Sequence, residues 1–257
     1  MRLSRRKLLI GAGAAGAVGG LGWAGAYAFK DRPLALVYRG PASCSGCSES
    51  VANLLAGMPI GFRTEFCGPD EARQISAGAL AGAVVYAQPG GGSIGRAWRS
   101  LRDHADDIRA FVRDGGNYLG FCLGGYLAGP GRGFGLLSAE VDSYISSPRA
   151  SVHDTADTLV QIRWRGELRS MYFQDGPVFR LRPGASATVL ATYDTGEPAA
   201  VVAGYGAGRV GVVGPHPEAD ELWYADVGLT NPEGIRQDLG HDLIESTVYG
   251  RDSVQGN

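Results

Sequence analysis

An excess of charge of either sign is absent from this sequence. It carries 24 lysines and arginines against 26 aspartates and glutamates, for a formal net charge of −2. No block of basic residues recurs after the N-terminus. A protein that binds a nucleic-acid backbone needs a concentrated positive surface to neutralise phosphates. We therefore expect no nucleic-acid partner.

Internal repeats, low-complexity segments and linkers are also absent. The chain has 257 residues, of which 44% are hydrophobic, so it is long enough and apolar enough to bury a compact core. We therefore expect one domain over 29–250, preceded by a segment of different character at 1–28.

This N-terminal segment has the pattern of an export signal. Arg5 and Arg6 lead into a Gly/Ala-rich apolar stretch with no acidic residue as far as Phe29, and Ala26 and Ala28 suit a signal peptidase. A twin-arginine signal predicts transient contact with the export machinery, cleavage, no stable membrane contact, and a periplasmic, cell-surface or secreted destination. An uncleaved anchor stays open, because the run approaches the roughly 20 residues that span a bilayer. A cytosolic N-terminal helix is the third interpretation.

In the rest of the chain, the pattern of predicted secondary structure changes near the middle. In the first half, apolar runs at 34–38, 62–66, 83–87 and 118–121 alternate with helical stretches at 49–55 and 98–112. This alternation predicts an α/β fold with a doubly wound, mostly parallel sheet. In the second half, runs joined by turns predict additional antiparallel strands at 141–145, 158–164, 168–173, 187–193 and 199–205. A strand at 209–213 and a closing helix at 232–248 complete one sheet system.

Cys122 follows a predicted strand and precedes small residues that open a helix, in the order Gly120-Phe121-Cys122-Leu123-Gly124. Such a turn requires small neighbours because the backbone of the central residue is strained, and it lifts that residue's side chain above the sheet edge toward solvent. The helix N-terminus favours thiolate at this position. The alternative is a buried core cysteine, since cysteine is among the most buried residue types.

His216 and Glu218 favour the catalytic interpretation of Cys122. They follow a late apolar strand, and their spacing in an extended segment directs both side chains to the same side. A histidine so placed can exchange a proton with the thiol while the carboxylate orients the ring.

A glycine run after the third strand, at 90–92, supplies a third element. Backbone N–H groups of Gly90 and Gly91, together with that of Leu123, can form an oxyanion hole. A glycine run by itself also fits a flexible loop. All three elements occur at strand ends, where wound sheets bind ligands.

Together these residues resemble a known superfamily. Pro89-Gly90-Gly91, the Cys122 turn and His216-Pro217-Glu218 are similar to the three signatures of class I glutamine amidotransferase-like proteins. More closely, the segments 37–40, 88–91 and 115–122 resemble the amidotransferase-like domain at the N-terminus of the larger biotin-protein ligases. The likeness covers about 34–248 and implies a flavodoxin-like sheet.

The resemblance also implies roles for residues. Cys122 would be the nucleophile, His216 the general base and acid, Glu218 the orienting carboxylate, and the amides of Gly90, Gly91 and Leu123 the oxyanion donors. The implied reaction is attack on the carbonyl carbon of a small amide or peptide, which breaks the C–N bond, releases ammonia or an amine and leaves a thioester that water hydrolyses. True amidotransferases hand ammonia to a synthase partner, and no such recipient is evident here. A stand-alone hydrolase and a non-catalytic binding or regulatory module therefore both stay open.

The other cysteines lie after the first two strands, at Cys44, Cys47 and Cys67, on the same expected edge as Cys122. We expect a disulfide between Cys44 and Cys47, or from one of them to Cys67. A bridge that reaches Cys122 and a thiol-disulfide activity are alternatives. One CxxC lacks the second ligand pair of a structural zinc site, so we expect no metal, and the sequence indicates no cofactor.

Gln174 and Asp175 end a predicted strand beside a tight turn. They suit either a pocket that recognises a substrate amide or amine, or an ordinary turn. Trp98, Trp164 and Trp223 are interpreted as core or rim aromatics.

Overall fold

The computed structural model describes residues 32–59 and 61–250. The predicted export signal at 1–28 lies outside these residues. In chain order the strands and α-helices are β1 (Leu34–Tyr38), α2 (Cys47–Ala56), β2 (Arg63–Cys67), α3 (Ala77–Leu80), β3 (Val85–Gln88), α4 (Ile94–Leu101), α5 (Ala105–Arg113), β4 (Asn117–Phe121), α6 (Leu123–Ala128), β5 (Ala139–Ser143), β6 (Thr158–Trp164), β7 (Glu167–Phe173), β8 (Pro177–Leu181), β9 (Ala187–Tyr193), β10 (Pro198–Tyr205), β11 (Gly208–Val213), α7 (Glu221–Asp226) and α8 (Gln237–Tyr249).

One nine-stranded sheet runs through the molecule in the order β2-β1-β3-β4-β11-β10-β9-β6-β7. The first five strands in this order, β2, β1, β3, β4 and β11, pair in parallel. The last four, β10, β9, β6 and β7, continue the sheet with antiparallel pairs. The prediction of a doubly wound α/β sheet with antiparallel strands in the second half is confirmed. A separate two-stranded sheet, β5-β8, lies outside this system.

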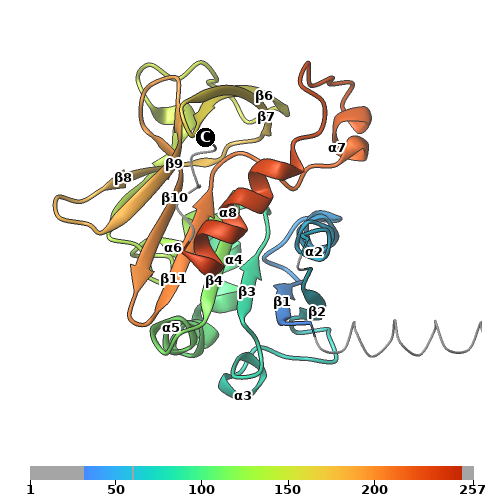
Figure 1. Cartoon of the computed structure of the whole chain (residues 1–257), viewed down its shortest axis with the longest axis vertical. Helices are drawn as coiled ribbons and strands as arrows, with labels where there is room; N and C mark the ends of the chain where they lie inside the picture. Colours follow the sequence, from blue (N-terminus) through green and yellow to red (C-terminus); the bar gives the residue numbers. More distant parts are fainter. Residues whose placement is uncertain (1–31, 60, 251–257) are drawn as a thin grey trace, which may run out of the picture.

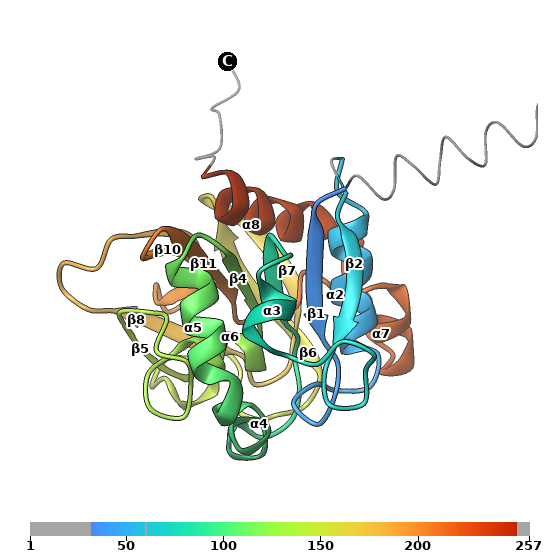
Figure 2. The ribbon, with the colours of Figure 1, turned by 90° about the horizontal axis from the view of Figure 1, so that it is seen from below.

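Helices cover both faces of the sheet, with α2 and α8 on one side and α3 to α6 on the other (Figures 1 and 2). The first face buries side chains such as Leu54 and Leu243 against the sheet, and the second buries Leu101 and Ile108. The central strands β1, β3 and β4 are buried along their whole length. Strands covered on both faces have no solvent-facing side, which explains their continuous apolar sequence.

Several elements differ from the prediction. The strand expected at 141–145 is β5 at Ala139–Ser143, because Tyr144–Ser146 form a 3-10 turn, and it pairs with β8 instead of joining one sheet system. The helix expected over 98–112 is divided into α4 and α5 by the 3-10 turn Arg102–His104, although the buried residues keep helical spacing across the break. The helix expected over 232–248 begins only at Gln237, because Asn231 donates its side-chain amide to the Ser170 carbonyl and accepts from the Glu233 amide, which fixes a turn. Strand β8 was not predicted, since Pro177 at its start reads as the end of a turn.

Candidate active site

Cys122 lies on a sharp turn between β4 and α6. Its backbone has φ 47° and ψ −104°, a conformation that non-glycine residues rarely adopt. The neighbouring glycines allow the turn, since a Cβ on Gly120 would lie 2.5 Å from the Gly124 carbonyl oxygen and one on Gly124 would lie 2.1 Å from that of Gln88. The strain is held by the parallel pairing of β4 with β11, where the Cys122 amide donates to the Val213 carbonyl at 2.9 Å. A strained residue at a strand end is typical of functional sites.

The Cys122 sulfur does not point into open solvent, which differs from the prediction made from the sequence. The residue is only 5% exposed, because the chain after β7 covers it. Its Sγ lies 3.6 Å from the Gln174 carbonyl oxygen, to which the thiol donates. Cys122 nevertheless lines a pocket, so part of this residue borders open space.

His216 and Glu218 follow β11 and form a buried pair. The Nδ1 of His216 lies 2.8 Å from Oε1 of Glu218, and the two residues are 4% and 0% exposed. The His216 amide donates to the Tyr172 carbonyl at 2.9 Å, which fixes the backbone of the pair against β7. The chain turns at Pro217 and Glu218, where the Ala219 amide donates to the His216 carbonyl at 3.2 Å, so the extended segment expected from the sequence is not found. The expected contact between the two side chains is nevertheless present.

The imidazole of His216 lies beside Cys122. Burial by itself lowers the pKa of the ring, but the negative charge of Glu218 and the neighbouring Cys122 sulfur outweigh burial and raise that pKa to about 10. An opposite charge at hydrogen-bond distance stabilises the protonated ring. A ring that holds a proton beside the sulfur can pass that proton to a departing group.

Gly90 brings the glycine-rich turn against this pair. A Cβ on Gly90 would lie 2.9 Å from Cε1 of His216 and 3.7 Å from the Cβ of Cys122. A Cβ on Gly91 would lie 2.8 Å from a methyl group of Leu123. The three predicted oxyanion-hole residues thus adjoin the cysteine and histidine. Among the described residues, the amides of Gly91 and Leu123 have no hydrogen-bond acceptor, so both remain available.

The pocket in front of Cys122 has a volume of about 710 Å³. We call it the cysteine pocket; its lining residues are Gly91, Gly92, Ser93, Ile94, Cys122, Leu123, Tyr126, Val141, Asp142, Ser143, Thr155, Gln174 and Asp175. Asp175 has a positive φ of 45°, and its carboxylate accepts a 2.5 Å hydrogen bond from the Ser143 hydroxyl. The Tyr126 hydroxyl donates to the Asp175 carbonyl at 3.2 Å. Gln174 and Asp175 are therefore pocket residues as well as turn residues.

The remaining cysteines are separated in the structure. Cys44 and Cys47 form a disulfide, whereas Cys67 is a buried free thiol whose pKa is raised by burial to about 12. The Cys44 amide donates to the Gly90 carbonyl at 3.0 Å, so the disulfide loop contacts the glycine-rich turn. Cys122 is also a free thiol, so no bridge reaches it.

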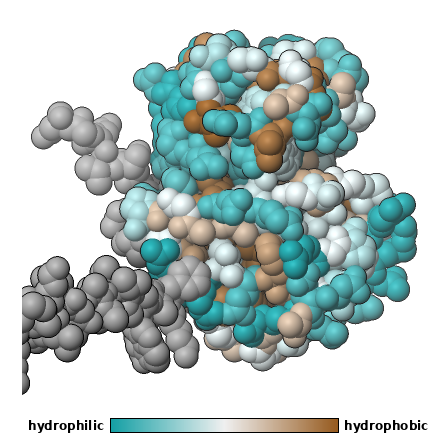
Figure 3. All heavy atoms as spheres, turned by 90° about the vertical axis from the view of Figure 1, so that its right-hand side faces the viewer, coloured by the Kyte–Doolittle hydropathy of each residue, from teal (hydrophilic) through white to brown (hydrophobic). Residues whose placement is uncertain are grey.

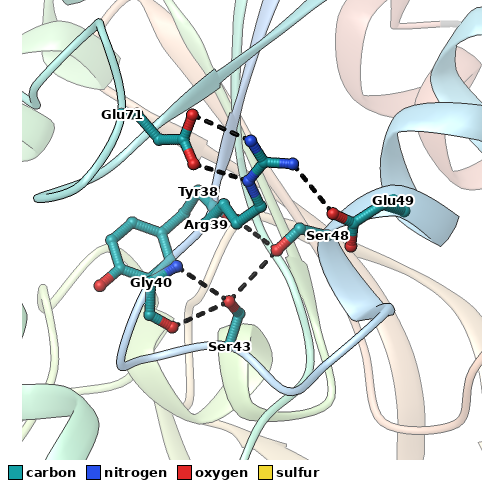
Figure 4. Close-up of polar contacts among 7 residues, drawn as sticks. All are labelled: Tyr38, Arg39, Gly40, Ser43, Ser48, Glu49 and Glu71. Atoms are coloured by element: carbon teal, nitrogen blue, oxygen red, sulfur yellow. Dashed lines mark hydrogen bonds and ion pairs between the residues drawn. The ribbon is translucent and has the colours of Figure 1, made fainter.

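Polar contacts hold the disulfide loop at the end of β1 (Figure 4). Arg39 contacts Glu71 at 2.6 Å and Glu49 at 3.0 Å, which ties the end of β1 to α2 and to the chain after β2. Ser43 and Ser48 share a 3.2 Å hydrogen bond, and the Ser48 hydroxyl donates to the Tyr38 carbonyl at 2.8 Å. The loop that contacts Gly90 is therefore fixed from both sides.

Two aromatic residues near His216 were not predicted as site residues. The ring centroids of Tyr172 and Trp223 lie 5.9 Å and 5.1 Å from that of His216. The Trp223 indole donates to the Ser50 hydroxyl at 3.0 Å, which connects α7 to α2. Trp223 follows Glu218 by five residues, and that nearness along the chain was the available signal.

Over residues 32–59 and 61–250, no group of histidine, cysteine and acidic side chains has the arrangement of a metal site. Within the same ranges, no helix is both long enough and apolar enough to cross a membrane.

Comparison with known proteins gives a family match for part of the chain. Residues 80–139, which include the glycine-rich turn and Cys122, match the family described as biotin-protein ligase, N terminal. His216 and Glu218 lie outside the matched segment. No curated protein matches the sequence.

Solved structures match over most of the chain. A protein from Thermoplasma acidophilum that is provisionally assigned as part of a GMP synthase has 14% identity and a TM-score of 0.53, over 86% of this chain and 96% of that chain. Two cytoplasmic proteins from Salmonella typhimurium have TM-scores of 0.51. One is 13% identical over 84% of this chain and 99% of its own, and the other 12% identical over 82% and 98%. Residues 80–139 are thus similar to the N-terminal domain of biotin-protein ligases, on a fold shared with these three proteins.

Proposed function

We propose that this protein is a cysteine-dependent hydrolase of C–N bonds in small amides or peptides. The observation that carries the proposal is the placement of Cys122 on a strained turn beside the imidazole of His216, whose other side is bound by buried Glu218. A nucleophile, a base and an orienting carboxylate in contact are the parts that acyl transfer requires.

The proposed reaction has two steps. The Cys122 sulfur attacks the amide carbon, and the carbonyl oxygen gains negative charge that the free amides of Gly91 and Leu123 can stabilise. His216 gives a proton to the departing nitrogen, so ammonia or an amine leaves and a thioester remains. Water then attacks the thioester with His216 as base, which releases the acid and restores the thiol. Glu218 keeps the ring oriented in both steps.

We further propose that the protein works outside the cytoplasm, after export through its N-terminal segment. The Cys44–Cys47 disulfide supports this location, because disulfides persist mainly in oxidising compartments. Its proposed partners are the substrate and, transiently, the export machinery.

A panel of neutral and charged carboxamides and dipeptides tests the hydrolase proposal by release of ammonia or amine. We expect turnover by the wild type and a loss of at least about 10⁴-fold in Cys122→Ser, since removal of a triad nucleophile has that order of effect. A thiol alkylator at near-neutral pH should label Cys122 selectively, and His216→Ala should abolish that labelling.

A binding or regulatory module on the same scaffold is the second candidate. The observation in its favour is that Cys122 is only 5% exposed and already donates to the Gln174 carbonyl. An inert Cys122 together with no turnover of any amide would support this candidate. Rapid labelling of Cys44 or Cys47 after mild reduction would instead support a thiol-disulfide protein.

A further inference from the structure

A second pocket lies close to His216, the proposed base. It has a volume of about 590 Å³ and lies between the start of α2 and α7. Figure 3 views the molecule from the side of these helices, and the surface there is hollowed between an upper and a lower part. We call it the α2–α7 pocket. It shares Gln174 with the cysteine pocket, so one residue borders both.

Two aromatic rings connect the α2–α7 pocket to His216. Tyr172 and Trp223 line it, and their ring centroids lie 5.3 Å apart at an interplanar angle of 83°. Both rings also contact the His216 ring. A molecule in this pocket would therefore be separated from His216, the proposed base, by the rings of Tyr172 and Trp223.

The pocket is lined by carboxylates and by no basic side chain. Its acidic residues are Glu49, Asp157, Asp220 and Asp226. Only Glu49 is paired with a cation in the described chain, through Arg39. Asp157 accepts from the Tyr172 hydroxyl and Asp220 from backbone amides of α7, and such neutral donors leave the negative charge in place.

Negative charge and aromatic side chains in one concave site suit a cation. A low-dielectric cleft lined by one sign of charge raises the local concentration of the opposite charge. Tyr and Trp faces attract ammonium and guanidinium groups. The cysteine pocket likewise has no basic lining residue that would pair with the carboxylate of a free amino acid.

We propose that the α2–α7 pocket binds the ammonium or guanidinium group of an amide substrate whose scissile bond lies at Cys122. This inference rests on the proposed hydrolase function and specifies its substrate class as cationic amides. Gln174 lies at the border that such a substrate crosses. Asp226 is the most suitable residue to test, because it is exposed on α7 and has no ion pair in the described chain.

Binding measured without turnover separates the substrate class from the reaction. Calorimetry on the Cys122→Ser protein would compare N-acetyl-lysine amide with its neutral analogue N-acetyl-norleucine amide. We expect the lysine compound to bind about five- to tenfold more tightly at low salt, as one or two partly screened charge contacts would give. In the Cys122→Ser background, Asp226→Asn should reduce that preference to about twofold, and Asp157→Asn should also reduce it. Glu167→Gln, an exposed change at the distant start of β7, should leave it intact.

The outcomes distinguish the two proposals. Equal affinity for the lysine and norleucine compounds, or equal effects of Asp226→Asn and Glu167→Gln, would overturn the cation site even if the wild type hydrolyses amides. Selective binding of the lysine compound without hydrolysis by the wild type would retain the cation site and reject the hydrolase. Higher kcat/KM for lysine amides than for norleucine amides, reduced by added salt, would support both.

Discussion

The two halves of the sheet contribute different parts of the site. In the parallel half, β1, β3 and β4 are buried throughout, and their ends carry the disulfide loop, the Gly90 turn and Cys122. In the antiparallel half, strands such as β6 alternate buried and exposed residues, and the chain after β7 supplies Gln174 and Asp175. The buried backbone of the parallel half thus fixes the position of the proposed reacting groups, while the antiparallel half supplies residues that line the cysteine pocket.

Strand β11 joins these halves, since it is parallel to β4 and antiparallel to β10. It ends at Val213, beside Cys122, and the chain after it carries His216 and Glu218. The difference between the halves predicts that changes in the reacting groups reduce turnover of every substrate. Changes in the pocket walls should alter KM and substrate preference.

Among changes to residues other than the nucleophile, Glu218→Gln should have the largest effect. The Glu218 charge raises the pKa of His216 against the opposing effect of burial, so its removal lowers that pKa from about 10. The ring then loses its proton at lower pH. We expect kcat to fall about 10³-fold for all substrates, with the alkaline limit of activity moved to lower pH, because the departing nitrogen takes its proton from His216.

Glu221→Gln is the matched control, because that carboxylate is exposed on α7 only three residues later. It should leave the pH profile unchanged. A Glu218→Gln protein with a wild-type pH profile would contradict the assigned role of the carboxylate.

Gly90→Ala should reduce kcat about 10²-fold, the order of effect of a displacement of about 1 Å at a reacting group. The added methyl group would lie 2.9 Å from the His216 ring and must displace it. Gly92→Ala in the same turn is the control, since its methyl group meets nothing within 4 Å. Equal kinetics for the two variants would show that the turn does not constrain the histidine.

Replacement of both Cys44 and Cys47 by serine should act mainly on stability. A disulfide that closes so short a loop contributes on the order of 2 kcal/mol to the free energy of unfolding. The loop keeps its backbone contact with Gly90 and the Arg39 contacts, so we expect kcat within about threefold of wild type. Urea unfolding and steady-state kinetics measure the two effects. Ser45→Ala, an exposed change in the same loop, should alter neither.

Ser143→Ala should have the smallest effect, and it tests the pocket wall. It removes the 2.5 Å hydrogen bond to the Asp175 carboxylate, which contributes about 1 kcal/mol. We expect KM to change about fivefold with kcat retained. Ser138→Ala, exposed just before β5, is the control. A fall in kcat with unchanged KM would contradict the division of roles between the two halves.

Much of the fold was predictable because the signals are local. The limits of β1, β6 and β9 were predicted without error from runs of apolar and β-branched residues. Strand β8 was missed because its signal begins with proline, and the start of α8 was misplaced because a side-chain contact between Asn231 and β7 sets it. Long-range contacts of this kind leave no periodic pattern in the sequence.

The candidate site divides in the same way. Cys122, Gly90, His216 and Glu218 were identified from short motifs, since a strained turn and a histidine–carboxylate pair each require particular residues at fixed spacing. The cover over the sulfur and the aromatic rings of Tyr172 and Trp223 were not identified, because they come from β7 and α7 and meet His216 only after folding.

By itself, the sequence determined the α/β class, the strand ends that carry the motifs and the residue types able to exchange a proton with a thiol. Only the tertiary structure decided that Cys122 is nearly buried, that Cys44 pairs with Cys47 rather than with Cys67, and that two pockets meet at Gln174. The physical reason is distance along the chain. Backbone conformation and amphipathic pattern are properties of neighbouring residues, whereas burial, pairing and pocket shape depend on which distant strands the sheet places side by side.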